Sequence, residues 1–119
     1  MENQTKTRIN RINNVEINGH LGSDPELFTT RNGNKKVRVS IAQNNYTSTG
    51  KQVNWFNVIG WGDVAENIAG QLRKGDLAEF KGRIQSREYK NNAGVTCYTT
   101  EIVVNSFTLA TENELQKAG

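Results

Sequence analysis

The chain has 119 residues, a formal net charge of +3 and 34% hydrophobic residues. This length suits one domain, because two cores of half the size would be too small to hold a fold. No apolar run approaches the roughly 18–20 residues of a membrane span, and the polar residues 1–10 lack the apolar centre of a secretory signal. The one cysteine, Cys97, cannot form an internal disulfide and fits a reducing compartment. We therefore expect a cytoplasmic protein without a membrane partner, made of a flexible arm (1–10), one packed domain (11–110) and a short polar tail (111–119).

The first half of the packed domain shows the period-2 alternation of half-buried β-strands. Hydrophobic and polar residues alternate over residues 15–21, and the turn chemistry of residues 22–25 ends this strand. A second alternating strand covers residues 37–42. Residues 44–52 are polar and contain a glycine, which predicts a loop, and a third strand follows at 53–59.

The hydrophobic period then changes to that of a helix over residues 63–74. Asp63 and Glu66 have the spacing of a capping box, and apolar residues follow at every third or fourth position. Basic residues occupy the expected last turn, where cations suit the helix dipole. Gly75 suits the position just past the end of the helix.

Two longer strands complete the domain, at residues 78–84 and 95–104, with a turn at 91–94 between them. Three strands, one helix and two strands is the order of the OB-fold, an all-β, five-stranded Greek-key barrel with its helix between strands three and four. Phe80 is expected inside this barrel, and Phe28 is a further candidate for the core. Other small folds with five strands and a helix share the order, so the order alone leaves them open.

The fourth expected strand carries a basic stripe. At period 2, one face from Ala78 to Ile84 suits the core, and opposite it lie Lys81, Arg83, Gln85, Arg87 and Tyr89. Such cations replace counterions on a phosphate chain, and an aromatic ring stacks on a base. An ordinary solvated strand face has the same pattern, so the stripe alone leaves both interpretations open.

Aromatic residues favour a nucleic-acid partner. Trp55 and Trp61 are six residues apart, so they share a face of the third strand, about 20 Å from each other at roughly 3.3 Å per residue. Trp61 lies between two glycines, and Tyr46 lies in the predicted polar loop. One tryptophan alone would be assigned to the core, but the pair together with Tyr46 and Tyr89 indicates a surface for base stacking. Because the only expected helix packs on the core and offers no recognition face to a duplex groove, we expect single strands.

The sequence lacks catalytic and metal-binding patterns. His20 and Cys97 are the only residues of their types, and Asp24 and Glu26 flank a proline in a turn. No CxxC, HExxH or phosphate-binding glycine loop occurs. We therefore expect a binding protein without enzymatic activity, cofactor or metal.

Five segments give the chain a family resemblance. They are GHLGSDPE (19–26), WFNVIGWG (55–62), LRKGD (72–76), GRIQSREY (82–89) and YTTEIVV (98–104). In this order and spacing the chain resembles the bacterial-type single-stranded DNA-binding proteins. The resemblance implies an OB-fold homotetramer that protects single-stranded DNA in replication, repair and recombination, associated with the nucleoid. The acidic, aromatic-tipped tail through which this family recruits other proteins has no counterpart in residues 112–119, so we expect no partner bound through it.

Residue pattern and resemblance together predict the site. The expected base-stacking residues are Trp55, Trp61, Tyr89 and Tyr46, and the expected phosphate-binding residues are Lys36, Arg38, Lys74, Lys81, Arg83 and Arg87. Phe56 stands where members of the family often have a histidine at a subunit contact. Val58 and Ile59 lie on opposite faces of the third strand, a hint that both faces are buried.

Two other functions stay open at this point. The first is an OB-fold accessory protein of a primosome or of an RNA-binding machine, which would use the same surface. The second is a small OB-barrel nuclease, which would require clustered carboxylates and a divalent metal.

Overall fold

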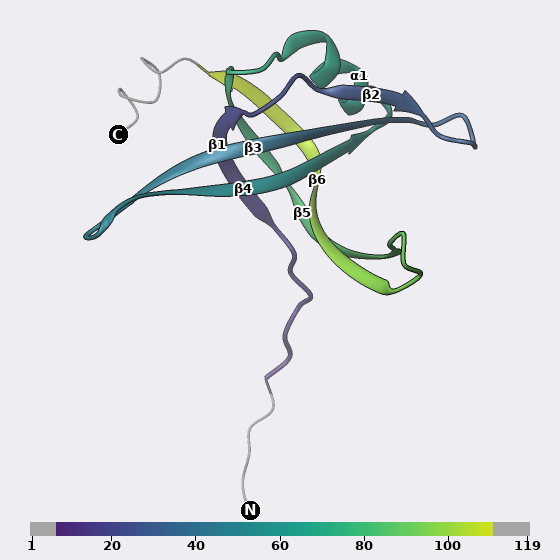
Figure 1. The fold of residues 1–119 in the computed structure, drawn as a ribbon, viewed down its shortest axis with the longest axis horizontal. Coiled ribbons are helices and arrows are strands. Elements are labelled where there is room, and N and C mark those ends of the chain that lie inside the picture. The colour runs from purple at the N-terminus through teal and green to yellow at the C-terminus, as the bar shows by residue number, and fades with distance from the viewer. Residues whose placement is uncertain (1–6, 111–119) are drawn as a thin grey trace, which may run out of the picture.

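Alternating hydrophobic residues build a β-barrel with one helix packed at one end (Figure 1). The structure is a computed structural model that describes residues 7–110; most of the predicted arm and all of the predicted tail lie outside these residues. The elements in chain order are β1 (Val15–Leu21), β2 (Glu26–Thr29), β3 (Lys35–Thr47), β4 (Gly50–Trp61), α1 (Gly62–Gln71), β5 (Leu77–Lys90) and β6 (Thr96–Ala110). Among the described residues, no helix has the length and apolar composition to cross a bilayer.

Five of the strands close into the barrel. The strand order is β1-β5-β6-β4-β3-β2, and β1 also pairs with β3 through Leu21 and Ile41, which closes the ring. β4 and β6 are parallel neighbours, and the other pairs are antiparallel. The helix lies between the third and fourth barrel strands, so the predicted OB-fold is confirmed. The short strand β2, added outside the barrel on β3, was not predicted, because its four residues are all exposed and show no alternation.

The core lies inside the barrel and beneath α1. Phe80, expected there, is completely buried. From α1 and the residue that follows it, Ala65, Ile68 and Leu72 pack in the same hydrophobic cluster as Phe80. The barrel strands contribute Leu21, Val37, Val39, Ile41, Val58, Ala78, Ile102 and Val104. At roughly 25 cal/mol per Å² of apolar area, this burial is the main force that holds the barrel.

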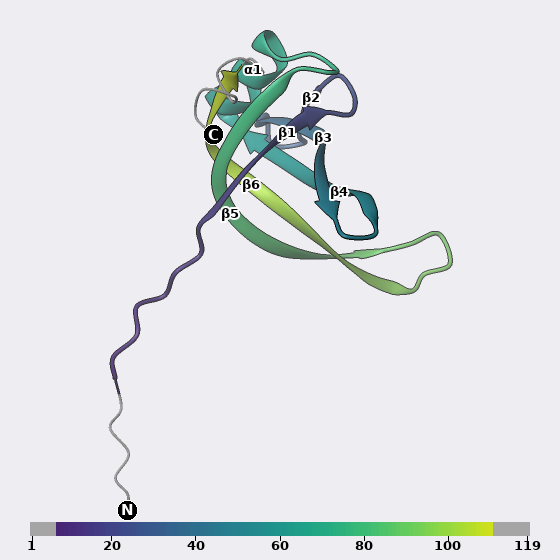
Figure 2. The ribbon, with the colours of Figure 1, turned by 90° about the vertical axis from the view of Figure 1, so that its left-hand side faces the viewer.

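Two hairpins extend from the barrel, and both are longer than predicted (Figures 1 and 2). Residues 44–52 were predicted to be a loop, and this prediction is wrong: β3 and β4 stay paired out to Thr47 and Gly50. Likewise, β5 and β6 stay paired out to Lys90 and Thr96. These strand ends are mostly polar and largely exposed on both faces, so backbone pairing forms them without the hydrophobic alternation on which the prediction relied.

The helix is also shorter than predicted. It begins at Gly62, directly after β4, so Trp61 is the N-cap and no side-chain cap bond forms. The expected capping box is therefore wrong, because Asp63 already lies in the first turn. Leu72 is extended and ends the helix, which leaves Gly75 in the following turn with a φ of 91°, rather than at the helix end.

Candidate nucleic-acid interface

One face of the sheet points away from the core across four strands. Lys36, Arg38 and Ser40 of β3 pair with Trp61, Ile59 and Asn57 of β4, and paired side chains lie on the same side of a sheet. The same face continues through Glu101 and Val103 of β6 to Gln85 and Arg83 of β5. We call this the outer face. It collects Lys36, Arg38, Tyr46, Trp55, Trp61, Arg83, Arg87 and Tyr89 from the predicted site.

Both tryptophans are open to solvent on the outer face. Trp55 is 62% exposed and Trp61 is 41% exposed, so neither belongs to the core. The Trp55 ring lies against Gly22, where an added Cβ would come within 2.5 Å of ring atom Cζ3. A glycine at this position is therefore needed for the indole to lie as it does.

A cation lies between two aromatic rings at one end of the outer face. Lys36 Nζ is 5.2 Å from the centroid of a Trp61 ring and 5.7 Å from that of Phe28. Phe28 was a candidate for the core, but it is exposed, because β2 lies outside the barrel and pairs Phe28 with Lys36. Recognising β2 in the sequence would have placed this ring on the surface. Stacked against the rings, the ammonium group remains available to a phosphate.

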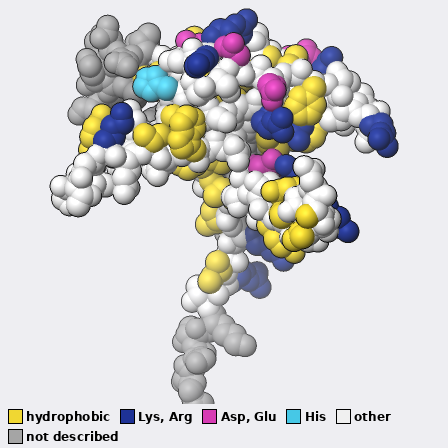
Figure 3. All heavy atoms as spheres, viewed as in Figure 1, with side chains coloured by type: hydrophobic (Ala, Val, Ile, Leu, Met, Phe, Trp, Pro, Cys, Tyr) yellow, Lys and Arg dark blue, Asp and Glu magenta, His cyan; other side chains and the backbone are white. Residues whose placement is uncertain are grey.

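The two tyrosines lie on the two hairpins. Tyr46 is 75% exposed and pairs with Lys51 in the β3–β4 hairpin, so it lies in a strand and not in the predicted loop. Tyr89 is 42% exposed near the end of β5, and the guanidinium carbon of Arg87 is 5.8 Å from its ring centroid. In the space-filling view, exposed hydrophobic side chains lie beside Lys and Arg side chains at several places (Figure 3).

The remaining predicted cations lie at the margins. Lys81 is further round the barrel, opposite Glu16 of β1. Lys74 lies in the turn after α1, where its backbone N–H donates to Asp24 Oδ1 at 2.8 Å. The structure thus brings four of the six predicted cations together on β3 and β5, leaves Lys81 exposed on the same side of β5 beside β1, and places Lys74 in a turn outside the sheet.

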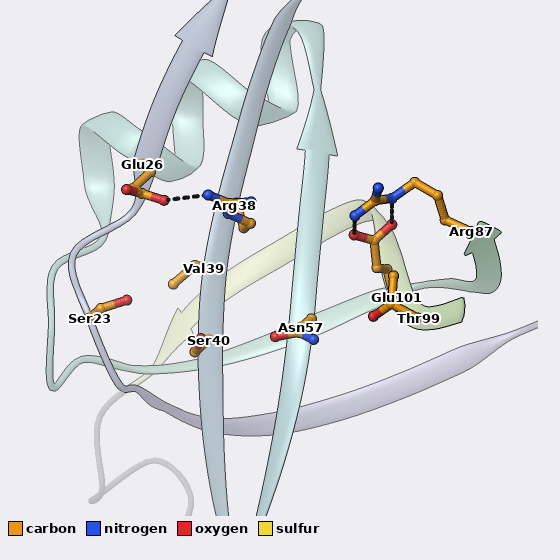
Figure 4. A pocket seen from close by; sticks show the side chains of 9 residues that line it. All are labelled: Ser23, Glu26, Arg38, Val39, Ser40, Asn57, Arg87, Thr99 and Glu101. Carbon is orange, nitrogen blue, oxygen red and sulfur yellow. Dashed lines mark hydrogen bonds and ion pairs between the residues drawn. The ribbon is translucent and has the colours of Figure 1, made fainter. Parts of the chain in front are cut away.

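Two carboxylates that received no role in DNA binding from the sequence hold arginines of the outer face. Glu26 accepts a hydrogen bond from Arg38 at 3.1 Å, and both side chains are more than half exposed. Glu101 accepts two bonds from Arg87, at 3.2 Å from Nε and 3.1 Å from Nη2, and is only 4% exposed. Between the two ion pairs lies a polar cavity of about 300 Å³ (Figure 4).

The Arg87–Glu101 pair changes the ionisation of both groups. Burial opposes the charge on Glu101, but the hydrogen bond and charge of Arg87 outweigh it, helped by Gln85 and Lys36, and the pKa of Glu101 falls below its usual value. The hydrogen bond to Glu101 is the main cause that raises the pKa of Arg87. Both groups are therefore charged at neutral pH, and each depends on the other.

Within residues 7–110, no group of three or more His, Cys, Asp or Glu side chains is placed to hold a metal ion. His20 lies in β1, and Cys97 lies in β6. Neither lies among the residues that line the cavity between the ion pairs.

Comparison with known proteins identifies the family. The model of the single-strand binding protein family matches residues 12–110. The chain is 38% identical over 101 residues to a single-stranded DNA-binding protein of Enterococcus faecalis, covering 82% of this chain and 54% of that protein. It is 36% identical over 98 residues to single-stranded DNA-binding protein A of Bacillus subtilis, covering 80% and 57%.

A third relative, single-stranded DNA-binding protein 1 of Streptococcus agalactiae, is 34% identical over 111 residues, covering 91% of this chain and 68% of that protein. The chain thus spans little more than half the length of most of these relatives. The family match covers the whole barrel, from before β1 to the end of β6. This chain therefore belongs to the single-strand binding protein family.

Proposed function

We propose that the chain binds single-stranded DNA with little sequence preference. Bases would stack on Trp55, Trp61, Tyr46 and Tyr89, and phosphates would be held by Lys36, Arg38, Arg83 and Arg87, with Lys74 and Lys81 at the margins. The observation that supports this most is two solvent-exposed indoles on one curved sheet face that also carries these cations. Stacking tolerates any base, since every base has a π-face.

Single strands fit this surface better than duplex. Unpaired bases offer their faces to rings on a sheet, whereas a duplex is read by an element that enters a groove. Such a protein would protect exposed strands during replication, repair and recombination, as a binding protein without catalysis. Its ligand would place it in the cytoplasm at the nucleoid.

Titration with a thymidine oligomer tests the proposal. Tryptophan fluorescence should be quenched at low salt, and the logarithm of the affinity should fall linearly with that of the salt concentration, by about 0.7 per phosphate contact. An RNA oligomer and a duplex of equal length are the controls, and both should bind more weakly. Absence of quenching at low salt would rule the function out, and stronger binding of RNA would favour the RNA-binding alternative.

We also propose that the chain forms a homotetramer. An apolar cavity of about 260 Å³ opens on the barrel, lined in part by Val15, Ile17, Phe56 and Ile84, and it borders the proposed DNA site through Trp55 and Asn57. Ile84 and Tyr98 are exposed nearby on the β5–β6 hairpin, and contiguous apolar surface of this kind favours protein contacts. Ile59 does not count as support, because it is already buried within one chain. A monomer mass in light scattering would contradict the proposal.

A further inference from the structure

The cavity between the two ion pairs is lined by a residue of β4 that lies between the two tryptophans in the strand. On β4, Asn57 faces outward between Trp55 and Trp61, two residues from one and four from the other. The Arg38–Glu26 pair borders one side of the cavity and the Arg87–Glu101 pair borders the other (Figure 4). A strand that stacks on both indoles must therefore pass over this cavity.

The charges around the cavity cancel. Two arginines and two glutamates line it, and each guanidinium is hydrogen-bonded to one carboxylate. An anion would gain little from a site with no net charge, whereas a neutral polar group meets both donors and acceptors. The interior of the cavity therefore suits a base better than a phosphate, whereas the Arg38 and Arg87 side chains, 55% and 44% exposed, can still hold phosphates at its rim.

Unused hydrogen-bonding groups face the cavity. Within the described residues, the side chains of Asn57, Ser40, Ser23 and Thr99 line it without making a hydrogen bond to the protein. Each guanidinium has five N–H donors and spends only one or two on its carboxylate. The volume of about 300 Å³ is about ten times the ~30 Å³ share of one water molecule, enough for the edge of a base.

The arrangement of donors and acceptors matches one type of base edge. Arginine donors lie on both sides of the cavity, and the Asn57 amide, whose oxygen is an acceptor, lies between them (Figure 4). The imide edge of thymine has the complementary order, one N–H donor between two carbonyl acceptors. We propose that this cavity receives the imide edge of one thymine, read by Asn57, between the bases stacked on Trp55 and Trp61. The inference rests on the proposed function.

An oligomer of N3-methylthymidine tests this inference. Methylation removes the N3–H donor and blocks the edge, but keeps the phosphates and the ring faces. The methylated and the unmethylated thymidine oligomers should have the same length, within the ~4–16 nucleotides that one OB domain covers. The wild-type protein should bind the methylated oligomer about five- to tenfold more weakly than the unmethylated one, which is the loss expected for one or two hydrogen bonds.

Two variants locate the effect. Asn57→Ala should bind both oligomers with nearly equal affinity, and Asn45→Ala, an exposed asparagine of β3 outside the cavity, should keep the wild-type discrimination. Equal binding of both strands by the wild-type protein, or full discrimination by Asn57→Ala, would overturn the inference while leaving the proposed function intact. Failure of both oligomers to bind at low salt would instead reject the proposed function.

Discussion

Replacing Arg87 by alanine is expected to lower the free energy of unfolding by about 1–3 kcal/mol, the cost of leaving a buried polar group without its partner. Glu101 is 4% exposed and depends on Arg87 for two hydrogen bonds. Removal of one partner from a fully buried pair costs more, but the Arg87 side chain is 44% exposed and water screens it. Urea unfolding measures the change. Strand affinity should fall as well, because an uncompensated carboxylate would then lie on the outer face.

The variant Arg87→Ala/Glu101→Gln is the control for this mechanism. It removes the orphaned charge, so it should recover part of the stability, with an interaction free energy of about 0.5–3 kcal/mol in the double-mutant cycle. Additive losses in the cycle would contradict a coupled pair between Arg87 and Glu101.

Glu26→Gln should act differently, because the Arg38–Glu26 ion pair is solvated. The substitution should change the free energy of unfolding by less than about 1 kcal/mol, and it should tighten strand binding by releasing Arg38.

The difference in the free energy of unfolding between wild type and Arg87→Ala should depend on pH, and the lowered pKa of Glu101 gives the direction. Because the pKa of Glu101 is lowered in the folded protein, the ion pair contributes stability above the ordinary glutamate pKa of about 4.3, and this contribution is lost as the pH falls through the lower folded value. The gap in stability between wild type and Arg87→Ala should therefore shrink in acid.

The barrel was predictable from sequence where burial is periodic. Residues 15–21 alternate between core and solvent, and the structure has β1 over the same residues. The prediction was wrong where a strand is polar on both faces, as at residues 44–52, because pairing with a neighbouring strand leaves no hydrophobic signature. It was also wrong at the start of α1, where direct exit from β4 makes Trp61 the cap.

The site was predictable as a set of residue types but not as a set of contacts. Two tryptophans on one strand face, one of them between glycines, and cations on alternate positions suggested a surface, and both indoles are indeed exposed. Glu101 was missed because only the strand register brings it beside Arg87, 14 residues away in the chain. The roles of these side chains in binding stay predictions.

Replacing Trp55 by alanine should weaken binding of a thymidine oligomer by about 1–3 kcal/mol, the range expected for loss of one base-stacking ring. Trp55 is the more exposed of the two indoles, and Gly22 leaves the space that one edge of its ring occupies. Stability should change little, because the side chain is 62% exposed. The affinity is measured from the quenching of the remaining tryptophan, Trp61, across a series of salt concentrations.

The salt dependence separates stacking from charge in this variant. Trp55→Ala removes no positive charge, so its affinity should fall by the same factor at every salt concentration and the slope should stay that of the wild type. Trp55→Phe, which keeps an aromatic face, should retain most of the affinity. A flatter slope in Trp55→Ala would mean that the indole acts by placing neighbouring cations, and a loss in Trp55→Phe as large as that in Trp55→Ala would mean that stacking of a base on this ring is not what holds the strand.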